Sequence, residues 1–237
     1  SRKAIGIAER YQEGVYATVG LHPIHTEKSY HDEQELGIAN KELGGFTSRG
    51  EEIDYAYYKK LAMHPRVVGI GECGLDYFRD FSPRETQRSA FARQLELAVA
   101  SRRPLFLHQR DAHGDFLAML KEQGARLPAG VAHCFTSGPD ELADYLDIGL
   151  YIGITGWICD ERRAADLRAA VAGLPLDRVV VETDAPYLLP RTIRPAPRTR
   201  RNEPAWLTEV VRTLAEFIGQ SLERVADCAG HRPVGNH

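Results

Sequence analysis

The stretch VVGIGE at residues 67–72 is an apolar run that ends in a single carboxylate, Glu72. Three further runs have the same form: PLFLH at 104–108, GVAHCF at 130–135 and VVVETD at 179–184. A short continuous apolar run is typical of a strand that is buried on both faces of a parallel sheet. The four runs therefore predict a parallel α/β fold in which each strand carries one polar side chain to its downstream end.

These four polar side chains have the chemistry of metal ligands. A lone histidine on an apolar run is more often a hydrogen-bonded core residue, so the prediction depends on all four together. Buried carboxylates are costly unless a cation accompanies them, and imidazoles with carboxylates suit a divalent cation such as Mg²⁺, Mn²⁺ or Zn²⁺. In a β/α barrel the active site lies at the carboxyl ends of the strands. We therefore predict a hydrolase with one or two metal ions held by Glu72, His108, His133 and Asp184.

The whole chain alternates strand and helix patterns, which predicts a TIM-type (β/α) barrel. Six strands are expected against the eight of a complete barrel, and we expect the missing two to lie upstream of Ser1. Residues 1–237 are expected to form one domain whose last residues, about 228–237, are disordered. The expected strands are 15–23, 67–72, 104–108, 130–135, 150–158 and 179–184, and the expected helices are 51–62, 82–100, 114–123, 139–146, 162–172 and 204–219. Ser82 with Glu85 predicts a capping box at the second of these helices.

Composition and charge narrow the class of protein. The 237 residues contain 43% hydrophobic and 27% charged residues, which is ordinary for a soluble globular domain. No apolar stretch approaches the ~20 residues of a transmembrane helix, and the first residues do not resemble a secretory signal. The four cysteines lack CxxC spacing, which favours a reduced, cytoplasmic location. The net charge of −3 gives no general attraction to nucleic acid or to a membrane, so a polyanionic substrate needs a local basic patch.

One such patch is RTIRPAPRTRR at residues 191–201, which contains five arginines and no acid. A charge run is often only a solvated loop, but this one directly follows the strand that ends in Asp184. Arginine binds phosphate oxygens with two parallel hydrogen bonds, so we expect Arg191 and Arg201 to contact the substrate. Trp157 and Tyr187 are expected in loops where they either stack on a nucleobase or pack at the rim.

Three more residues are assigned by their positions beside the expected strand ends. His22 precedes Pro23 and either caps a turn or contacts the phosphate or leaving group, so it is a candidate catalytic residue. Asp76 either forms an Asx turn, contacts the substrate or hydrogen-bonds a ligand histidine. Glu182 lies two residues before Asp184, on the same side of the strand, and is expected to support a ligand.

Together these motifs resemble the TatD family of metal-dependent deoxyribonucleases, and look most like its bacterial branch. The resemblance runs from Val15 to about Gly219 and includes motifs in the expected order. They are GLHP at 20–23, GECGLDY at 71–77, FLHQRDAH at 106–113, AHCFTS at 132–137, YIGITGWICDERR at 151–163, ETDAPYLLPR at 182–191 and RRNEP at 200–204. The His-x-His pair that many relatives carry on their first strand is absent from this sequence.

The resemblance implies hydrolysis of DNA from the 3′ end of single strands, with a role in DNA repair or turnover. By position it implies that Glu72, His108 and His133 are metal ligands, that Asp184 is the catalytic aspartate and a further ligand, and that His22 lies near the active site.

Two other functions stay open at this point. The same fold and metal could hydrolyse an ester or amide, such as an aminoacyl-tRNA ester, although no lysine ends an apolar strand to form a bridging carbamate. The arginine-rich loop favours phosphate over that alternative. The chain could also be a truncated, inactive protein that only binds metal or nucleic acid.

Overall fold

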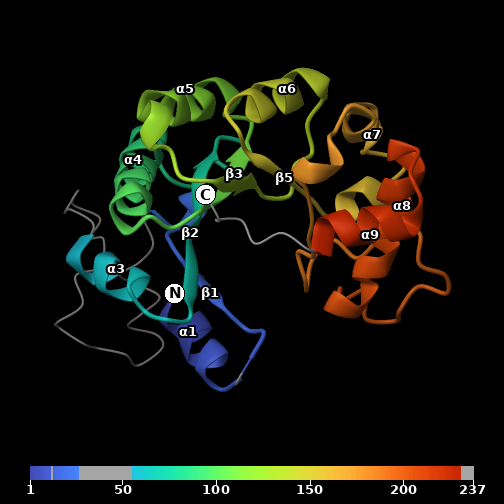
Figure 1. The fold of residues 1–237 in the computed structure, drawn as a ribbon, viewed down its shortest axis with the longest axis horizontal. Coiled ribbons are helices and arrows are strands. Elements are labelled where there is room, and N and C mark those ends of the chain that lie inside the picture. The colour runs from blue at the N-terminus through green and yellow to red at the C-terminus, as the bar shows by residue number, and fades with distance from the viewer. Residues whose placement is uncertain (12, 27–54, 231–237) are drawn as a thin grey trace. The chain divides into compact units, whose positions relative to one another are not determined.

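The computed structural model describes residues 1–11, 13–26 and 55–230, and it divides into two compact units, Ser1–Ala129 and Gly130–His237 (Figure 1). Each unit alternates strands with helices, and all paired strands within a unit are parallel. The six predicted strands are confirmed. The expected single domain stays a prediction, and residues 231–237 of the expected disordered tail lie outside the described residues.

The first unit contains three strands, in the order β1, β2, β3. A parallel pair needs a helical crossover, and the intervening segments supply those helices. The bounds are α1 Arg2–Glu9, β1 Ala17–Val19, α3 Tyr55–Ala62, β2 Val67–Asp76, α4 Arg84–Ser101, β3 Leu105–Arg110 and α5 His113–Gln123, with short 3₁₀ turns at Pro23–His25 and Gly124–Arg126.

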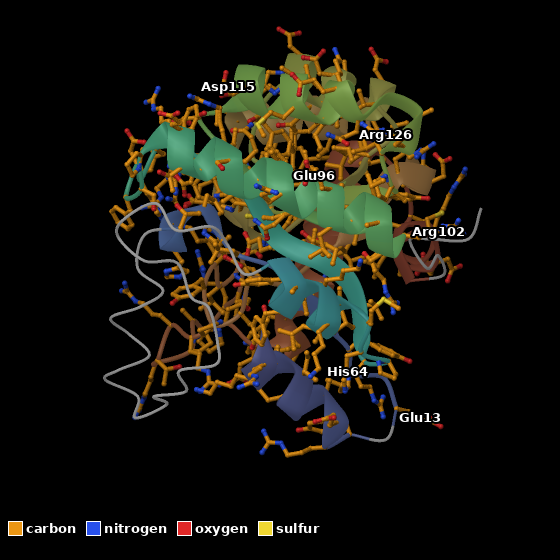
Figure 2. All side chains as sticks on the ribbon, turned by 90° about the vertical axis from the view of Figure 1, so that its left-hand side faces the viewer. Glu13, His64, Glu96, Arg102, Asp115 and Arg126 are labelled. Atoms are coloured by element: carbon orange, nitrogen blue, oxygen red, sulfur yellow. The ribbon has the colours of Figure 1, made fainter. Side chains whose placement is uncertain are left out.

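Helix α4 covers strand β2 with an apolar face that includes Phe91 and Leu95, both buried. The ring of Phe91 stacks on Phe116 of α5, with centroids 5.4 Å apart, which joins the two helices. Figure 2 looks onto this helical layer, where Glu96 lies on the exposed side of α4 and Asp115 at the start of α5. The buried face of α4 thus lies directly behind the strand that carries Glu72.

Strand β2 has an irregularity at the position that matters most for function. Its register against β3 shifts between Gly71 and Cys73, so Glu72 is the additional residue of a bulge. A bulge changes the direction in which a side chain points, and bulges are common beside active sites. The strand was expected to end at Glu72, but it continues to Asp76. A bulge turns the Glu72 side chain without ending the strand.

The second unit begins with β4 and also contains three strands, in the order β4, β5, β6. Its core includes Ile152 and Ile154 of β5 together with Leu214 of α8, all fully buried. The bounds are β4 Gly130–Ala132, α6 Pro139–Asp147, β5 Tyr151–Ile154, α7 Ala165–Val171, β6 Val179–Val181, α8 Leu207–Ile218 and α9 Leu222–Gly230, with 3₁₀ turns at Gly156–Cys159, Leu176–Arg178 and Pro204–Trp206. Helix α9 was not predicted, and it includes residues 228–230 of the tail that was expected to be disordered.

The predicted capping box at α4 is wrong. The helix begins at Arg84, so Pro83 occupies the N-cap position and no side chain caps the helix. Ser82 is buried, and its hydroxyl has no hydrogen-bond partner among the residues that the structure describes. The Ser82 carbonyl instead accepts a hydrogen bond from the side chain of Gln87, one turn into the helix.

Among the described residues, no helix is long and apolar enough to cross a membrane.

Candidate metal centre and its supporting contacts

His22, Glu72 and His108 form the first candidate ligand group, in the unit that begins at Ser1. One nitrogen or oxygen from each side chain lies within 4.8 Å of the others. Glu72 Oε1 is 2.8 Å from His108 Nδ1 and 3.4 Å from His22 Nε2, and the two imidazole rings have centroids 4.4 Å apart. The bulge in β2 turns Glu72 toward the histidines that follow β1 and lie in β3.

The hydrogen bonds of His22 determine which of its two ring nitrogens carries the proton. His22 Nδ1 accepts a hydrogen bond from the backbone N–H of Ile24 at 3.2 Å, so in the neutral ring the proton is on Nε2. That Nε2–H points at Glu72 and acts as a donor. His22 therefore fits the role of a hydrogen-bond donor better than that of a ligand.

Asp76 determines which ring nitrogen of His108 carries a proton. Its side chain is completely buried, with Oδ2 3.2 Å from His108 Nε2. Arg79 holds the same carboxylate through its backbone N–H and its guanidinium, at 2.8 and 2.6 Å. An ionised carboxylate can only accept, so His108 Nε2 carries a proton and Nδ1 faces Glu72. Of the alternatives expected for Asp76, the contact with a histidine is confirmed. The expected Asx turn is wrong, because Asp76 Oδ1 accepts from the N–H three residues on rather than two. The substrate contact of Asp76 stays a prediction.

The charges of this group are strongly coupled. Burial opposes ionisation of Glu72, Asp76 and His108, but the hydrogen bonds among them outweigh it. The pKa values of both carboxyls are held below their usual range, and the pKa of His108 is raised. A proton on His108 Nδ1 thus occupies the place that a cation beside Glu72 would take. Metal binding here is expected to displace that proton.

Two buried glutamines of α4 hold the backbone of this group. Gln94 accepts from the Leu21 N–H at 2.7 Å and donates to the Leu21 carbonyl at 3.1 Å, next to His22. Gln87 accepts from the Asp76 N–H at 2.8 Å and donates to the Asp76 carbonyl. Sequence reasoning missed both residues, because a glutamine in a helix is usually a solvated residue.

Replacing Gln94 by leucine is expected to lower the free energy of unfolding by about 1–3 kcal/mol, because it leaves the buried N–H and carbonyl of Leu21 unpaired. Activity should also fall, since His22 is the next residue. Urea unfolding measures the first effect. The exposed substitution Glu96→Leu on the same helix is the control, and equal stability of the two variants would contradict the proposed support.

His133, Glu182 and Asp184 form the second candidate ligand group, in the unit that begins at Gly130. Glu182 Oε2 is 2.9 Å from His133 Nδ1 and also accepts the Cys134 N–H at 3.1 Å. Proton donation from Nδ1 leaves the lone pair of His133 on Nε2, which lies 3.5 Å from Asp184 Oδ1. A carboxylate behind the other ring nitrogen is the usual arrangement of a metal-ligating histidine. The expected supporting contact of Glu182 is confirmed.

The backbone around this group leaves room for Glu182. A Cβ at Gly153 of β5 would overlap the Glu182 carboxylate, so a larger residue there would displace this carboxylate from its present position. His133 follows the last residue of β4, and Asp184 lies three residues beyond β6. His133 is thus at a strand end as predicted, while Asp184 is in the loop after its strand.

The remaining predicted substrate residues lie in the loop after Asp184. The Arg191 guanidinium is half exposed and lies 3.6 Å from Asp160 and from Glu161. Arg201 is exposed, and its backbone N–H donates to Thr199. Tyr187 is 71% exposed, which leaves its ring accessible to a base.

Asn202 supports the arginine-rich loop from within. The side chain is buried, and its Nδ2 donates to Thr183 Oγ1 at 3.1 Å and to the Tyr187 carbonyl at 2.7 Å. These bonds join the residue that follows the arginine-rich loop to Thr183, which precedes Asp184, and to Tyr187. The turn at Pro204 has Glu203 as its N-cap, without a side-chain hydrogen bond.

The chain is similar in sequence to known proteins. A family model described as "TatD related DNase" matches residues 1–231. The chain is 43% identical to the 3′-5′ ssDNA/RNA exonuclease TatD of Cronobacter sakazakii, over 98% of this chain and 81% of that protein. It is 44% identical to the protein of the same name from Klebsiella pneumoniae, over 94% of this chain and 76% of that protein.

Two solved structures resemble the fold. A TatD homologue of Escherichia coli superimposes with a TM-score of 0.76 at 27% identity, over 96% of this chain and 78% of that chain. A TatD family hydrolase of Entamoeba histolytica gives a TM-score of 0.72 at 27% identity, over 96% of this chain and 77% of that chain. The predicted α/β fold of the TIM-type barrel class is thereby confirmed.

Proposed function

The chain belongs to the family of TatD-related DNases, and on that premise we propose that it is an exonuclease that removes nucleotides from the 3′ end of single-stranded DNA and RNA. The family makes it a hydrolase of phosphodiester bonds. The observation that supports the proposal most is the pair of histidines with a carboxylate behind one ring nitrogen, His108 with Asp76 and His133 with Glu182. This pattern suits metal ligation.

The proposed ligands are Glu72 and His108 in the first group and His133 and Asp184 in the second. Each group offers one imidazole nitrogen and one carboxylate oxygen, a donor set that fits Mg²⁺, Mn²⁺ or Zn²⁺. When bound, such a cation lowers the pKa of a water molecule and offsets the charge of the phosphoryl oxygens. Titration of the apoprotein with metal measures whether one or two ions bind.

The residues of the chain have separate roles in the proposed reaction. Asp184 is 37% exposed and carries a carboxylate that can accept a proton from the attacking water. His22 presents Nε2–H, which can donate a hydrogen bond to the leaving oxygen. Asp76 and Glu182 keep the ligand histidines in their tautomers, and the loop at 191–201 supplies positive charge for the phosphates.

The state of the cysteines bears on the cellular location that we propose. All four cysteines lie in the described part of the chain, and none of them forms a disulfide. Burial raises the pKa of Cys73, which keeps its thiol protonated. We propose a cytoplasmic enzyme of DNA repair or turnover.

The direct test uses single-stranded DNA and RNA that are blocked at either the 3′ or the 5′ end. We expect divalent metal to support release of mononucleotides, a chelator to abolish it, and a 3′ block alone to prevent it. Aminoacyl ester and cyclic amide substrates form the comparison set. Turnover of those substrates without hydrolysis of either nucleic acid would contradict the proposal.

Replacing Glu182 by glutamine is expected to weaken metal binding about 10- to 100-fold, because the amide no longer stabilises the Nδ1–H tautomer of His133 as strongly. Calorimetric titration of the apoprotein with Mn²⁺ measures the affinity. Glu161→Gln, an exposed change in the same unit, is the control. An unchanged metal affinity in Glu182→Gln would show that His133 does not depend on this carboxylate.

A further inference from the structure

The second unit contains a pocket of about 440 Å³ that neither ligand group explains. It lies where the turn Gly156–Cys159 and the residues after it meet the loop that follows Asp184. None of His133, Glu182 and Asp184 is among the described residues that line it. Five arginines line it against a single acid, Asp160; they are Arg162, Arg163, Arg191, Arg194 and Arg200. We call this the arginine pocket.

Asp160 organises three of these arginines. Its carboxylate is almost completely buried and accepts from Arg162 through Nε and a terminal nitrogen, both at 3.0 Å, and from Arg163 Nε at 2.9 Å. Arg191 lies 3.6 Å away. The bonds from Arg162 are the main reason that the pKa of Asp160 stays below its usual range. One negative charge therefore orients several guanidinium groups, and the pocket keeps a strong positive excess.

Trp157 adds a donor that lacks a partner in the described structure. Its indole Nε1 is buried without a hydrogen bond, and the Arg163 guanidinium lies over its ring at 4.2 Å from the centroid. A buried N–H without an acceptor is costly. Indole and guanidinium planes are also surfaces on which nucleobases stack.

The backbone fixes the pocket to the loop that carries Asp184. A Cβ at Gly156 would lie 2.2 Å from the Leu188 carbonyl, so a glycine is required where the turn meets this loop. Asn202 joins the loop to Thr183. The walls of the pocket are thus held beside the segment that presents Asp184.

We propose that the arginine pocket binds one nucleotide of the single-stranded substrate, other than the nucleotide that is cleaved. The arginines hold its phosphate, and its base or sugar packs at Trp157. The volume lies within the range of pockets for small ligands and is sufficient for one nucleotide. This inference deepens the proposed nuclease function and depends on it for the identity of the strand.

The test measures binding separately from hydrolysis. In a Trp206→Phe variant of the full chain, Trp157 is the only remaining tryptophan. A phosphorothioate single-stranded oligonucleotide is titrated in the presence of a chelator, and Trp157 fluorescence is recorded. We expect saturable quenching, with inorganic phosphate binding far more weakly than the oligonucleotide.

Arg194→Gln with Arg200→Gln removes charge from the pocket and leaves the three arginines at Asp160 in place. The dissociation constant is expected to rise at least tenfold. The slope of its logarithm against that of the salt concentration should fall by about 1.4, or about 0.7 for each lost contact with a single strand. Arg224→Gln with Arg212→Gln, two exposed changes in the same unit, is the matched control.

Hydrolysis of bis(p-nitrophenyl) phosphate, which is too short to reach a second nucleotide site, tests the proposed function itself. Hydrolysis of this substrate without a Trp157 response to the oligonucleotide would contradict nucleotide binding in the arginine pocket and would support the proposed nuclease function. Quenching that depends on Arg194 and Arg200, without hydrolysis of any phosphodiester, would support nucleotide binding in the pocket. The same result would contradict the proposed nuclease function. Equal affinity for inorganic phosphate and oligonucleotide would overturn nucleotide binding.

Discussion

Replacing His133 by alanine is expected to lower kcat/KM for single-stranded DNA by at least about a thousandfold, because a metal contributes several kcal/mol to catalysis and each 1.4 kcal/mol is a factor of ten. The same loss is expected for His108→Ala. Each variant removes the imidazole nitrogen and leaves its supporting carboxylate, Glu182 or Asp76, without its histidine partner. Steady-state kinetics at saturating Mn²⁺ measure the effect.

His64→Ala is the matched control for this pair. His64 is a partly exposed histidine of the first unit whose Nε2 lies 3.2 Å from Glu9, which belongs to neither ligand group. Its removal should leave kcat/KM unchanged. Circular dichroism should show that all three variants keep the fold. Metal-dependent activity that persists in both His108→Ala and His133→Ala would rule out the assigned ligands.

Replacing Asp184 by asparagine is expected to lower kcat by about 10²- to 10⁴-fold, the usual contribution of a general base. Asparagine has nearly the same shape as aspartate but cannot accept the proton of the attacking water. Because Asn202 holds the adjacent Thr183 in both proteins, the loop should keep its conformation and KM for the oligonucleotide should change little.

Two comparisons make the Asp184 test specific. Asp177→Asn, at an exposed position of the same unit, should have wild-type kcat. Asp184→Glu keeps the carboxylate and should recover part of the activity. An unchanged kcat in Asp184→Asn would show that proton transfer does not involve this residue, whichever residues bind metal.

The order of strands and the candidate ligands could be predicted because each depends on a local pattern. An apolar run bounded by glycine or proline identifies a buried strand, and a histidine or carboxylate near its downstream end is conspicuous. The two-residue period of a strand led to the expected contact of Glu182 with a ligand, although β6 ends at Val181, before both Glu182 and Asp184. These inferences need only the geometry of one segment.

The contacts that support the ligands could not be predicted, because they join segments far apart in sequence. Gln94 contacts Leu21 across 73 residues, and nothing in either segment indicates the other. The bulge at Glu72 depends on the register of two strands, which the sequence of one strand does not determine. The local motif at Ser82 also misled the prediction, because burial of its side chain overrode its capping preference.

The arginine pocket combines a feature that was predictable from one segment with contacts between segments that were not. The basic loop at 191–201 was evident from its composition, but its partners Arg162 and Arg163 come from the segment before α7. They meet through the buried carboxylate of Asp160, which was not singled out in the sequence. Charge composition identified one wall of the pocket, and only the folded structure identified the other.

The central claim is that the histidines backed by Asp76 and Glu182 bind metal. Crystals of the protein soaked with Mn²⁺ and measured for anomalous scattering test it most directly. We predict anomalous density about 2.0–2.6 Å from the side chains of Glu72 and His108 and from those of His133 and Asp184. Well-ordered density for these side chains, with no ion at any of them at saturating Mn²⁺, would contradict it.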